Sequence, residues 1–317
     1  MIRSLASLFF KSESEEISPS EKFYESLEAI CSWISVETIL AIASRNRLHP
    51  FDKDIYFEAC IHMHNEAIEH ARAVNLLVFK GRFDSAEALS RIAIESCINL
   101  EYALVDSEGE NIKEHVFSYI RNETGKIKKW LKWAEKSPFE REVIELIKNP
   151  AYQRSADLRR READMEKLFE YHDTKKAAPQ NVREKYKSIG READYLMAYQ
   201  VLCVKTHGGA EDLINKLSDT LMNPGRSREF LHSRAEKIKI HSKYLAALSQ
   251  YNLLLASNKI CLAITGEGLP EFDRKKQEIL ALLLSLSGEL SRRIFSKSEL
   301  DLHGYFVAGD LDFLNGR

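Results

Sequence analysis

AEALSRIAIESCINLEYAL, residues 86–104, is apolar almost all the way round a helix, yet it carries Arg91, Glu95 and Asn99 at four-residue spacing. A helix that is apolar on every side is normally buried in a protein core. A buried charge is costly unless it is paired and hydrogen-bonded. The stretch therefore predicts a core helix whose polar stripe faces partners from another part of the chain.

The best candidate partners lie about a hundred residues later, in YLMAYQVLCVKTHGG, residues 195–209. Tyr195 and Tyr199 are one helical turn apart, and His207 follows two turns beyond Tyr199. His207 precedes two glycines, where a helix should end and leave the ring near backbone carbonyls and open space. We interpret these two helices as the centre of one domain. Six side chains then form either a buried polar network or a ligand-binding site: Arg91, Glu95, Asn99, Tyr195, Tyr199 and His207.

The composition favours an all-α protein. Of 317 residues, 44% are hydrophobic, which is enough to fill a core, and only 13 Gly and 7 Pro provide turns. Few turns argue against a many-stranded sheet protein. The net charge of −2 provides no global field that would attract nucleic acid or anionic lipid, so any such binding has to be local.

Helical periodicity divides the chain into an antiparallel helical bundle with additional long C-terminal helices. We expect a flexible N-terminal lead-in over residues 1–20, a helical bundle core domain over 21–222, and a C-terminal helical hairpin with an irregular tail over 223–317. The predicted helices cover residues 22–45, 52–80, 83–105, 111–148 (divided near Ser137-Pro138), 155–172, 182–205, 227–264 and 271–295.

Cysteine usage indicates a reducing compartment. The five cysteines occur singly, without a Cys-x-x-Cys pair, as reduced core thiols do. The N-terminus matches neither a signal peptide nor a membrane span. We therefore expect a cytoplasmic protein without a membrane span.

Two further patterns have an ordinary structural interpretation. His62, Glu66 and His70 share a helix face, but three ligands spread over two turns of one helix cannot all reach one ion, so we expect no metal. KIKKWLKW, residues 126–133, mixes cations with aromatic rings, as nucleic-acid-binding surfaces do. Its Ile127, Trp130, Leu131 and Ala134 nevertheless fit a normal buried face, with the lysines in water.

A family resemblance rests on three short motifs. They are a helix that ends at Gly81, Ala86-x-x-Leu89-x-Arg91-x-x-x-Glu95, and Tyr195-x-x-x-Tyr199 followed by His207-Gly208. Over residues 55–214 the chain resembles a bacterial all-helical family known only as a domain of unknown function. Such helical proteins are likened to the HEPN nucleases, whose signature is an Arg and a later His with four to six residues between them. Arg226 to His232 and Arg234 to His241 match that spacing, although composition alone predicts about two matches.

Two classes of function follow. The first is a helical binding or regulatory protein of a bacterial stress or phage-defence locus, whose ligand is unknown and whose partner is RNA, a protein or a second copy of the chain. The alternative is an enzyme, an HEPN-like metal-independent ribonuclease in which a His acts as acid or base and an Arg stabilises phosphate charge. The chain has no Gly-rich phosphate loop, no Gly-x-Ser-x-Gly elbow and no His-Glu-x-x-His motif, so we expect no cofactor.

Overall fold

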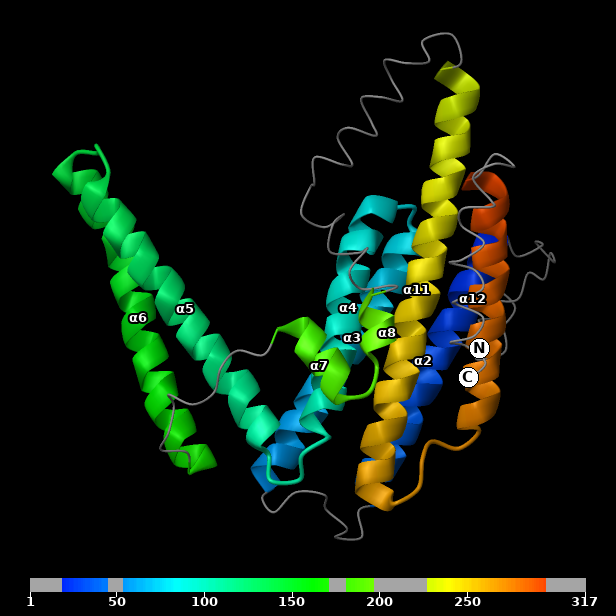
Figure 1. Cartoon of the computed structure of the whole chain (residues 1–317), viewed down its shortest axis with the longest axis horizontal. Coiled ribbons are helices and arrows are strands. Elements are labelled where there is room, and N and C mark those ends of the chain that lie inside the picture. The colour runs from blue at the N-terminus through cyan, green and yellow to red at the C-terminus, as the bar shows by residue number, and fades with distance from the viewer. Residues whose placement is uncertain (1–18, 45–53, 171–180, 197–226, 295–317) are drawn as a thin grey trace, which may run out of the picture.

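The computed structural model describes residues 19–44, 54–170, 181–196 and 227–294 (Figure 1). Of these residues 88% are helical, and none of them lies in a strand. The all-α prediction is therefore confirmed. The helices are α2 (Pro19–Ala43), α3 (Asp54–Phe79), α4 (Phe83–Ala103), α5 (Glu110–Lys136), α6 (Arg141–Phe169), α7 (Val182–Ser188), α8 (Glu192–Asp194), α11 (Ser227–Thr265) and α12 (Phe272–Ile294).

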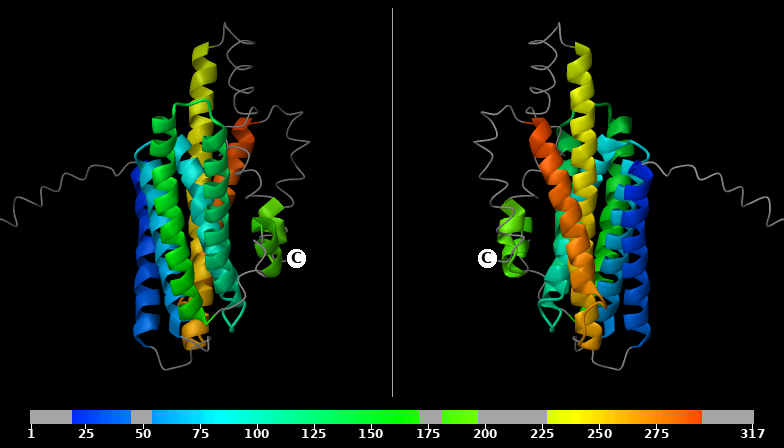
Figure 2. Two further views of the ribbon diagram at one scale, coloured as in Figure 1. Left: turned by 90° about the vertical axis from the view of Figure 1, so that its left-hand side faces the viewer. Right: turned by 90° about the vertical axis from the view of Figure 1, so that its right-hand side faces the viewer.

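Five long helices form the bundle, and α11 lies at its centre. It packs against α2, α3, α4 and α12, as Figures 1 and 2 show. One core cluster joins side chains from all five helices, among them Ile34, Cys60, Cys97, Leu254 and Ile279. The division into a core domain and a C-terminal hairpin stays a prediction, but α11 packs against three helices that the sequence analysis assigned to the core domain.

The N-terminal helix α2 is the only described helix that is long and apolar enough to cross a membrane. Its segment Ser20–Ala43 contains an 18-residue stretch with a mean hydropathy of 1.5, and 28% of that stretch is buried. Leu27, Cys31 and Ile34 on this helix are nevertheless fully buried, and α2 packs on α3 and α11. A core helix of a soluble bundle passes the same test, so the described residues contain no clear membrane span.

Helices α5 and α6 form a hairpin, which we call the arm, that leans away from the bundle (Figure 1). The arm has its own small core of Ile127, Ala151 and Leu158. At its base, the ring of Phe169 stacks on Tyr56 of α3 with the ring centroids 5.7 Å apart. The arm is thus anchored at one end, and its tip extends outward.

Helix α6 differs from the predicted pattern. The sequence pattern predicts one helical segment that ends at residue 148 and another that begins at residue 155, but α6 continues through Pro150. Proline cannot donate the hydrogen bond that the carbonyl of Leu146 would accept. Leu146 is 72% exposed, so water can reach this part of the helix. The helix continues here because the residue that loses its partner lies at the surface.

Four of the five cysteines lie among the described residues, and all four are free and buried, as predicted: Cys31, Cys60, Cys97 and Cys261. Burial raises the pKa of the Cys31 and Cys60 thiols to about 12. These thiols are therefore protonated and unreactive at neutral pH. Cys203, residues 1–18 of the predicted lead-in and residues 295–317 lie outside the described residues. Residues 19 and 20, which the sequence pattern assigns to the lead-in, begin helix α2.

Candidate functional site

A glycine turn between α7 and α8 places an arginine inside the bundle. Gly190 has a φ of +75°, and its amide donates to the Lys187 carbonyl. The amide of Arg191 donates to the Tyr186 carbonyl at 2.7 Å. These two bonds form a Schellman motif, which ends α7 and turns the chain sharply. The predicted continuous helix over residues 182–205 is therefore wrong at Gly190, and the turn brings Arg191 toward α4 and α11.

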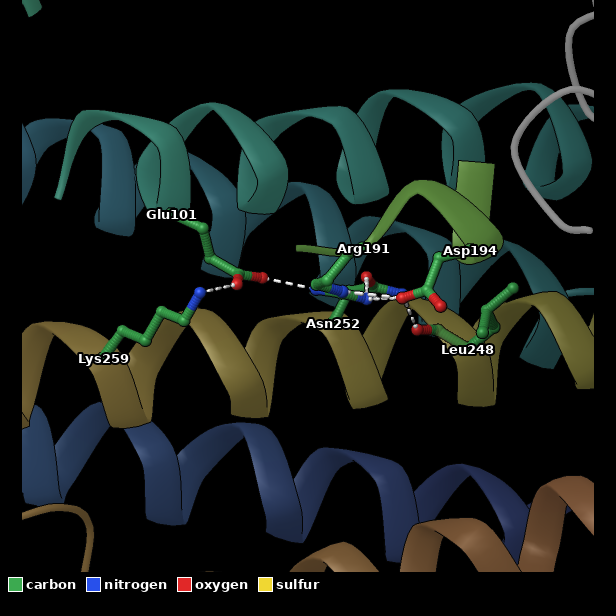
Figure 3. A network of polar contacts seen from close by, with 6 residues as sticks. All are labelled: Glu101, Arg191, Asp194, Leu248, Asn252 and Lys259. Carbon is green, nitrogen blue, oxygen red and sulfur yellow. Dashed lines mark hydrogen bonds and ion pairs between the residues drawn. The ribbon is translucent and has the colours of Figure 1, made fainter. Parts of the chain in front are cut away.

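Arg191 reaches Glu101, a carboxylate with 0% exposure on α4 (Figure 3). One guanidinium nitrogen, Nη1, lies 2.5 Å from Glu101 Oε1. The second oxygen of Glu101 lies 2.6 Å from Nζ of Lys259 on α11. The buried carboxylate is thus held between two cations that come from different parts of the chain.

The remaining donors of Arg191 are also used. Nε donates to Asp194 Oδ2 at 2.6 Å, and Nη2 donates to Asn252 Oδ1 at 2.6 Å. The amide nitrogen of Asn252 donates to the Leu248 carbonyl at 2.8 Å, which fixes which way its oxygen points (Figure 3). The guanidinium fork therefore bridges α4, α8 and α11 through hydrogen bonds to each of them.

The electrostatics of this cluster favour full ionisation of the arginine. Burial alone would lower the pKa of Arg191, but the carboxylates of Glu101 and Asp194 raise it well above its ordinary value. Burial raises the pKa of Asp194, and Arg191 opposes that rise. Two carboxylates and two cations balance one another. A neutral, hydrogen-bonded ionic cluster is the form in which buried charges are tolerated in a core.

The cluster clamps helices together and is poorly suited to catalysis. A general base or nucleophile needs a free, activated atom next to open space. Here Glu101 is fully enclosed, and its two oxygens face Arg191 and Lys259. The cluster instead holds α4, α8 and α11 against one another through its hydrogen bonds and ion pairs.

The predicted polar stripe on α4 lies at the edge of the core. Arg91, Glu95 and Asn99 are all half-buried. Asn99 accepts a hydrogen bond from Nζ of Lys185 on α7 at 2.8 Å. Burial lowers the pKa of Lys185, while Glu95 and Glu114 act to raise it. The structure thus brings Asn99 and the neighbourhood of Glu95 to α7, near but not at the Glu101 cluster.

The predicted partners are placed only in part. Tyr195 packs edge-on against Tyr186 with the ring centroids 5.7 Å apart, next to Ile94 and Ile98 of α4. Tyr199 and His207 lie outside the described residues. That these two side chains join Arg91 and Glu95 in one site stays a prediction.

Sequence reasoning missed Glu101, and a signal for it exists. Glu101 follows Cys97 by four residues and Ile94 by seven, so the three share one helix face. Cys97 and Ile94 are buried, and Glu101 is buried with them. The Arg91 stripe lies on a different face. A charge in register with the core-facing residues predicts burial better than a charge that only lies close to them in sequence.

Three histidines of the bundle contact polar side chains of other helices. Nε2 of buried His64 lies 2.8 Å from the Ser257 hydroxyl, and Nδ1 of His70 lies 3.0 Å from the Ser96 hydroxyl. Nδ1 of His241 lies 3.1 Å from Glu87. Within the described ranges, no group of three or more His, Cys, Asp or Glu side chains is arranged to hold a metal ion.

The arm collects exposed cations and aromatic rings. Ile127 and Ala134 are buried against α6, as predicted, but Trp130 is 50% exposed, so its assignment to the buried face is wrong. The physical reason is that Ile127, Leu131 and Ala134 already fill the contact with α6. Trp133 is 55% exposed. Five lysines on the same helix are all exposed: Lys126, Lys128, Lys129, Lys132 and Lys136.

Comparisons with known proteins identify one relationship. A family model described as a family of unknown function, DUF5677, matches residues 57–224, which include α4, the arm and the Arg191 turn. Neither the curated proteins nor the solved structures contain a match to the chain.

Proposed function

The chain belongs to a family of unknown function, DUF5677, and we propose from its own residues that it is a binding protein that holds an anionic partner on the arm. The bundle is the scaffold in this proposal, because its buried charges are used in holding helices together. As the setting, we propose a bacterial stress or phage-defence locus.

One observation carries the proposal: positive charge is concentrated on the arm. Residues 121–154 contain nine Lys or Arg and five Asp or Glu, a local excess of four positive charges in a chain of net charge −2. Between residues 126 and 136 the balance is five lysines to Glu135 alone. Glu135 lies 3.7 Å from Lys148 of α6, so even this carboxylate is partly compensated.

Three of these lysines are available to a partner. Lys128, Lys129 and Lys132 are exposed, and within the described residues none of them forms an ion pair. Clustered cations of this kind attract polyanions in a salt-dependent manner.

The experiment is retention on a heparin column with a salt gradient. A triple variant, Lys128→Glu, Lys129→Glu and Lys132→Glu, should elute at much lower salt than the wild type. The matched control is Lys22→Glu, Lys80→Glu and Lys187→Glu, which makes the same change in net charge at exposed lysines outside the arm. The control should elute near the wild type. Equal elution of the two triple variants would show that net charge alone controls retention, and the proposal would be wrong.

The catalytic alternative is tested with the same protein. Fluorescently labelled single-stranded RNA incubated with the wild type, without metal, should remain intact. Cleavage that disappears in a folded His241→Ala variant would establish the ribonuclease and overturn a purely binding role. His241 is the suitable residue, because its Glu87 contact is described.

A further inference from the structure

We propose that the arm binds single-stranded nucleic acid, with Trp130 and Trp133 stacking on bases and the surrounding lysines contacting phosphates. This inference rests on the proposed function and names its partner. An anionic partner alone requires only the lysines. The two exposed indoles require a further explanation, because large aromatic side chains are usually buried.

The two indoles share one exposed face of α5 with cations. Trp130 and Trp133 are three residues apart, and Lys126 and Lys129 lie within one turn of them on the same side of the helix. Lys126 also forms an ion pair with Glu123 at 2.7 Å, whereas Lys129 forms none within the described residues. Proteins that bind single strands combine aromatic rings for bases with a positively charged track for the backbone. Residues 126–136 carry both components on one helix.

The ring of Trp133 is held in place before any partner binds. It packs edge-on against Phe139 in the turn between α5 and α6, with the ring centroids 6.2 Å apart and an interplanar angle of 72°. An aromatic pair of this kind restricts the indole, and Trp133 is still 55% exposed. Restricting a side chain beforehand reduces the entropy lost on binding.

The arrangement fits nucleic acid better than a lipid surface. An interfacial helix inserts a continuous apolar face into the bilayer. On α5 between residues 126 and 136, the aliphatic side chains Ile127 and Leu131 belong to the arm core against α6. The exposed apolar groups on this stretch are the two indoles, and lysines flank them. The planar indole rings can stack on bases, and the lysines beside them can contact phosphates.

Intrinsic fluorescence provides the test, because the chain has three tryptophans and two of them are on this face. A Trp33→Phe protein reports only on Trp130 and Trp133. Titration with oligo(U) and oligo(dT) should quench its emission, and quenching should weaken steeply as salt is raised. Comparing the two oligomers distinguishes RNA from DNA. Absence of quenching and of binding to either oligomer would overturn the inference.

Stacking is tested separately from charge. A Trp130→Ala, Trp133→Ala variant should lose about tenfold or more in affinity for labelled oligo(U) in an anisotropy assay, and its heparin retention should stay close to that of the wild type. Leu146→Ala is the matched control, because it removes an exposed apolar side chain from the same arm without removing a ring. Unchanged oligo(U) affinity in the tryptophan variant would refute base stacking and leave the anionic-partner proposal standing.

A membrane partner is the competing outcome. Vesicles of phosphatidylserine and phosphatidylcholine should compete weakly with oligo(U) for the arm. Vesicle binding that is tighter than oligo(U) binding, and that depends on both Leu146 and the tryptophans, would overturn the assignment to nucleic acid.

Discussion

At the scale of single residues, Glu101 and Arg191 determine how the bundle interior is held together. Glu101 has no contact with water, and Arg191 connects it to Asp194 and Asn252. Lys259 is 39% exposed, so water screens its ion pair with Glu101. The two cations around one carboxylate therefore contribute differently to stability.

Replacing the buried cation should be far more damaging than replacing the exposed one. Arg191→Met leaves Glu101 and Asp194 without their shared partner and should cost about 3–5 kcal/mol of unfolding free energy. Lys259→Met should cost less than about 1 kcal/mol. Urea unfolding followed by circular dichroism measures both.

The double variant Glu101→Leu with Arg191→Met is the control for that experiment. It removes the stranded Glu101 charge and should recover part of the loss, which a double-mutant cycle quantifies. If Arg191→Met and Lys259→Met lowered the unfolding free energy equally, the ion pair between Arg191 and Glu101 would not be shielded from water, and this prediction would be wrong.

His64 makes the stability of the bundle depend on pH. Burial lowers the pKa of His64 to about 4, against 6.5 in the unfolded chain. Between these values the unfolded chain binds more protons, so stability is full above about pH 6.5 and is lost as the pH falls toward 4, by up to about 3 kcal/mol. Urea midpoints at pH 7 and pH 5 should differ less in a His64→Gln variant than in the wild type. His62→Gln is the control, because His62 is exposed. If the urea midpoint of the His64→Gln variant changed between pH 7 and pH 5 as much as that of the wild type, this account would be wrong.

At the scale of elements, the sequence predicted which segments are helical, because apolar periodicity over twenty or more residues is a strong local signal. The predicted and observed limits of α3, α4, α11 and α12 agree within two residues among the described positions. The exceptions are Pro150, which α6 tolerates, and Gly190, which ends α7. Whether a helix continues through a proline or ends at a glycine depends on the tertiary surroundings of that residue, and the local sequence pattern does not specify them.

The candidate site was less predictable than the helices. Glu101 lies within the stretch that the sequence singled out, but its partners Arg191 and Lys259 follow it by 90 and 158 residues. Periodicity within one helix identifies a buried face and does not identify what packs on it. The exposure of Trp130 likewise depends on how many side chains the α6 contact can accommodate.

Gly109 connects α4 to the arm, and its replacement should weaken that junction. It has a φ of +75°, and an added Cβ would lie 2.6 Å from the ring of Tyr56, which is buried and stacked on Phe169. Gly109→Ala should therefore cost about 2 kcal/mol or more, through backbone strain and the clash. Gly125→Ala in α5 meets no neighbouring atom and should stabilise the protein by about 0.5–1 kcal/mol. The melting temperature should fall in Gly109→Ala and rise in Gly125→Ala. A rise in both variants would show that the added methyl group at residue 109 is accommodated without a clash.

At the scale of the whole molecule, α11 is the helix on which the others are assembled. It is 39 residues long, and its interior part is buried on all sides, including polar residues. Those polar side chains bond either to other helices, as Ser257 does with His64, or to the preceding turn, as Ser249 does with the Leu245 carbonyl. Among the buried polar side chains of α11, the one buried atom without a hydrogen-bond partner within the described residues is Nε2 of Gln250. Polar groups that are largely satisfied let a helix of mixed composition occupy the centre of a bundle.

The central place of α11 has a consequence for how the protein is made. The ribosome completes α2, α3 and α4 long before residue 227 is synthesised. These three helices can pack on one another, but the faces that α11 covers in the bundle stay open until then. At roughly 5–20 residues per second, the 158 residues between Glu101 and Lys259 take on the order of ten seconds or more. During that interval the nascent helices are exposed to aggregation and to chaperones. The core that α11 completes can therefore form only late, when the last third of the chain emerges.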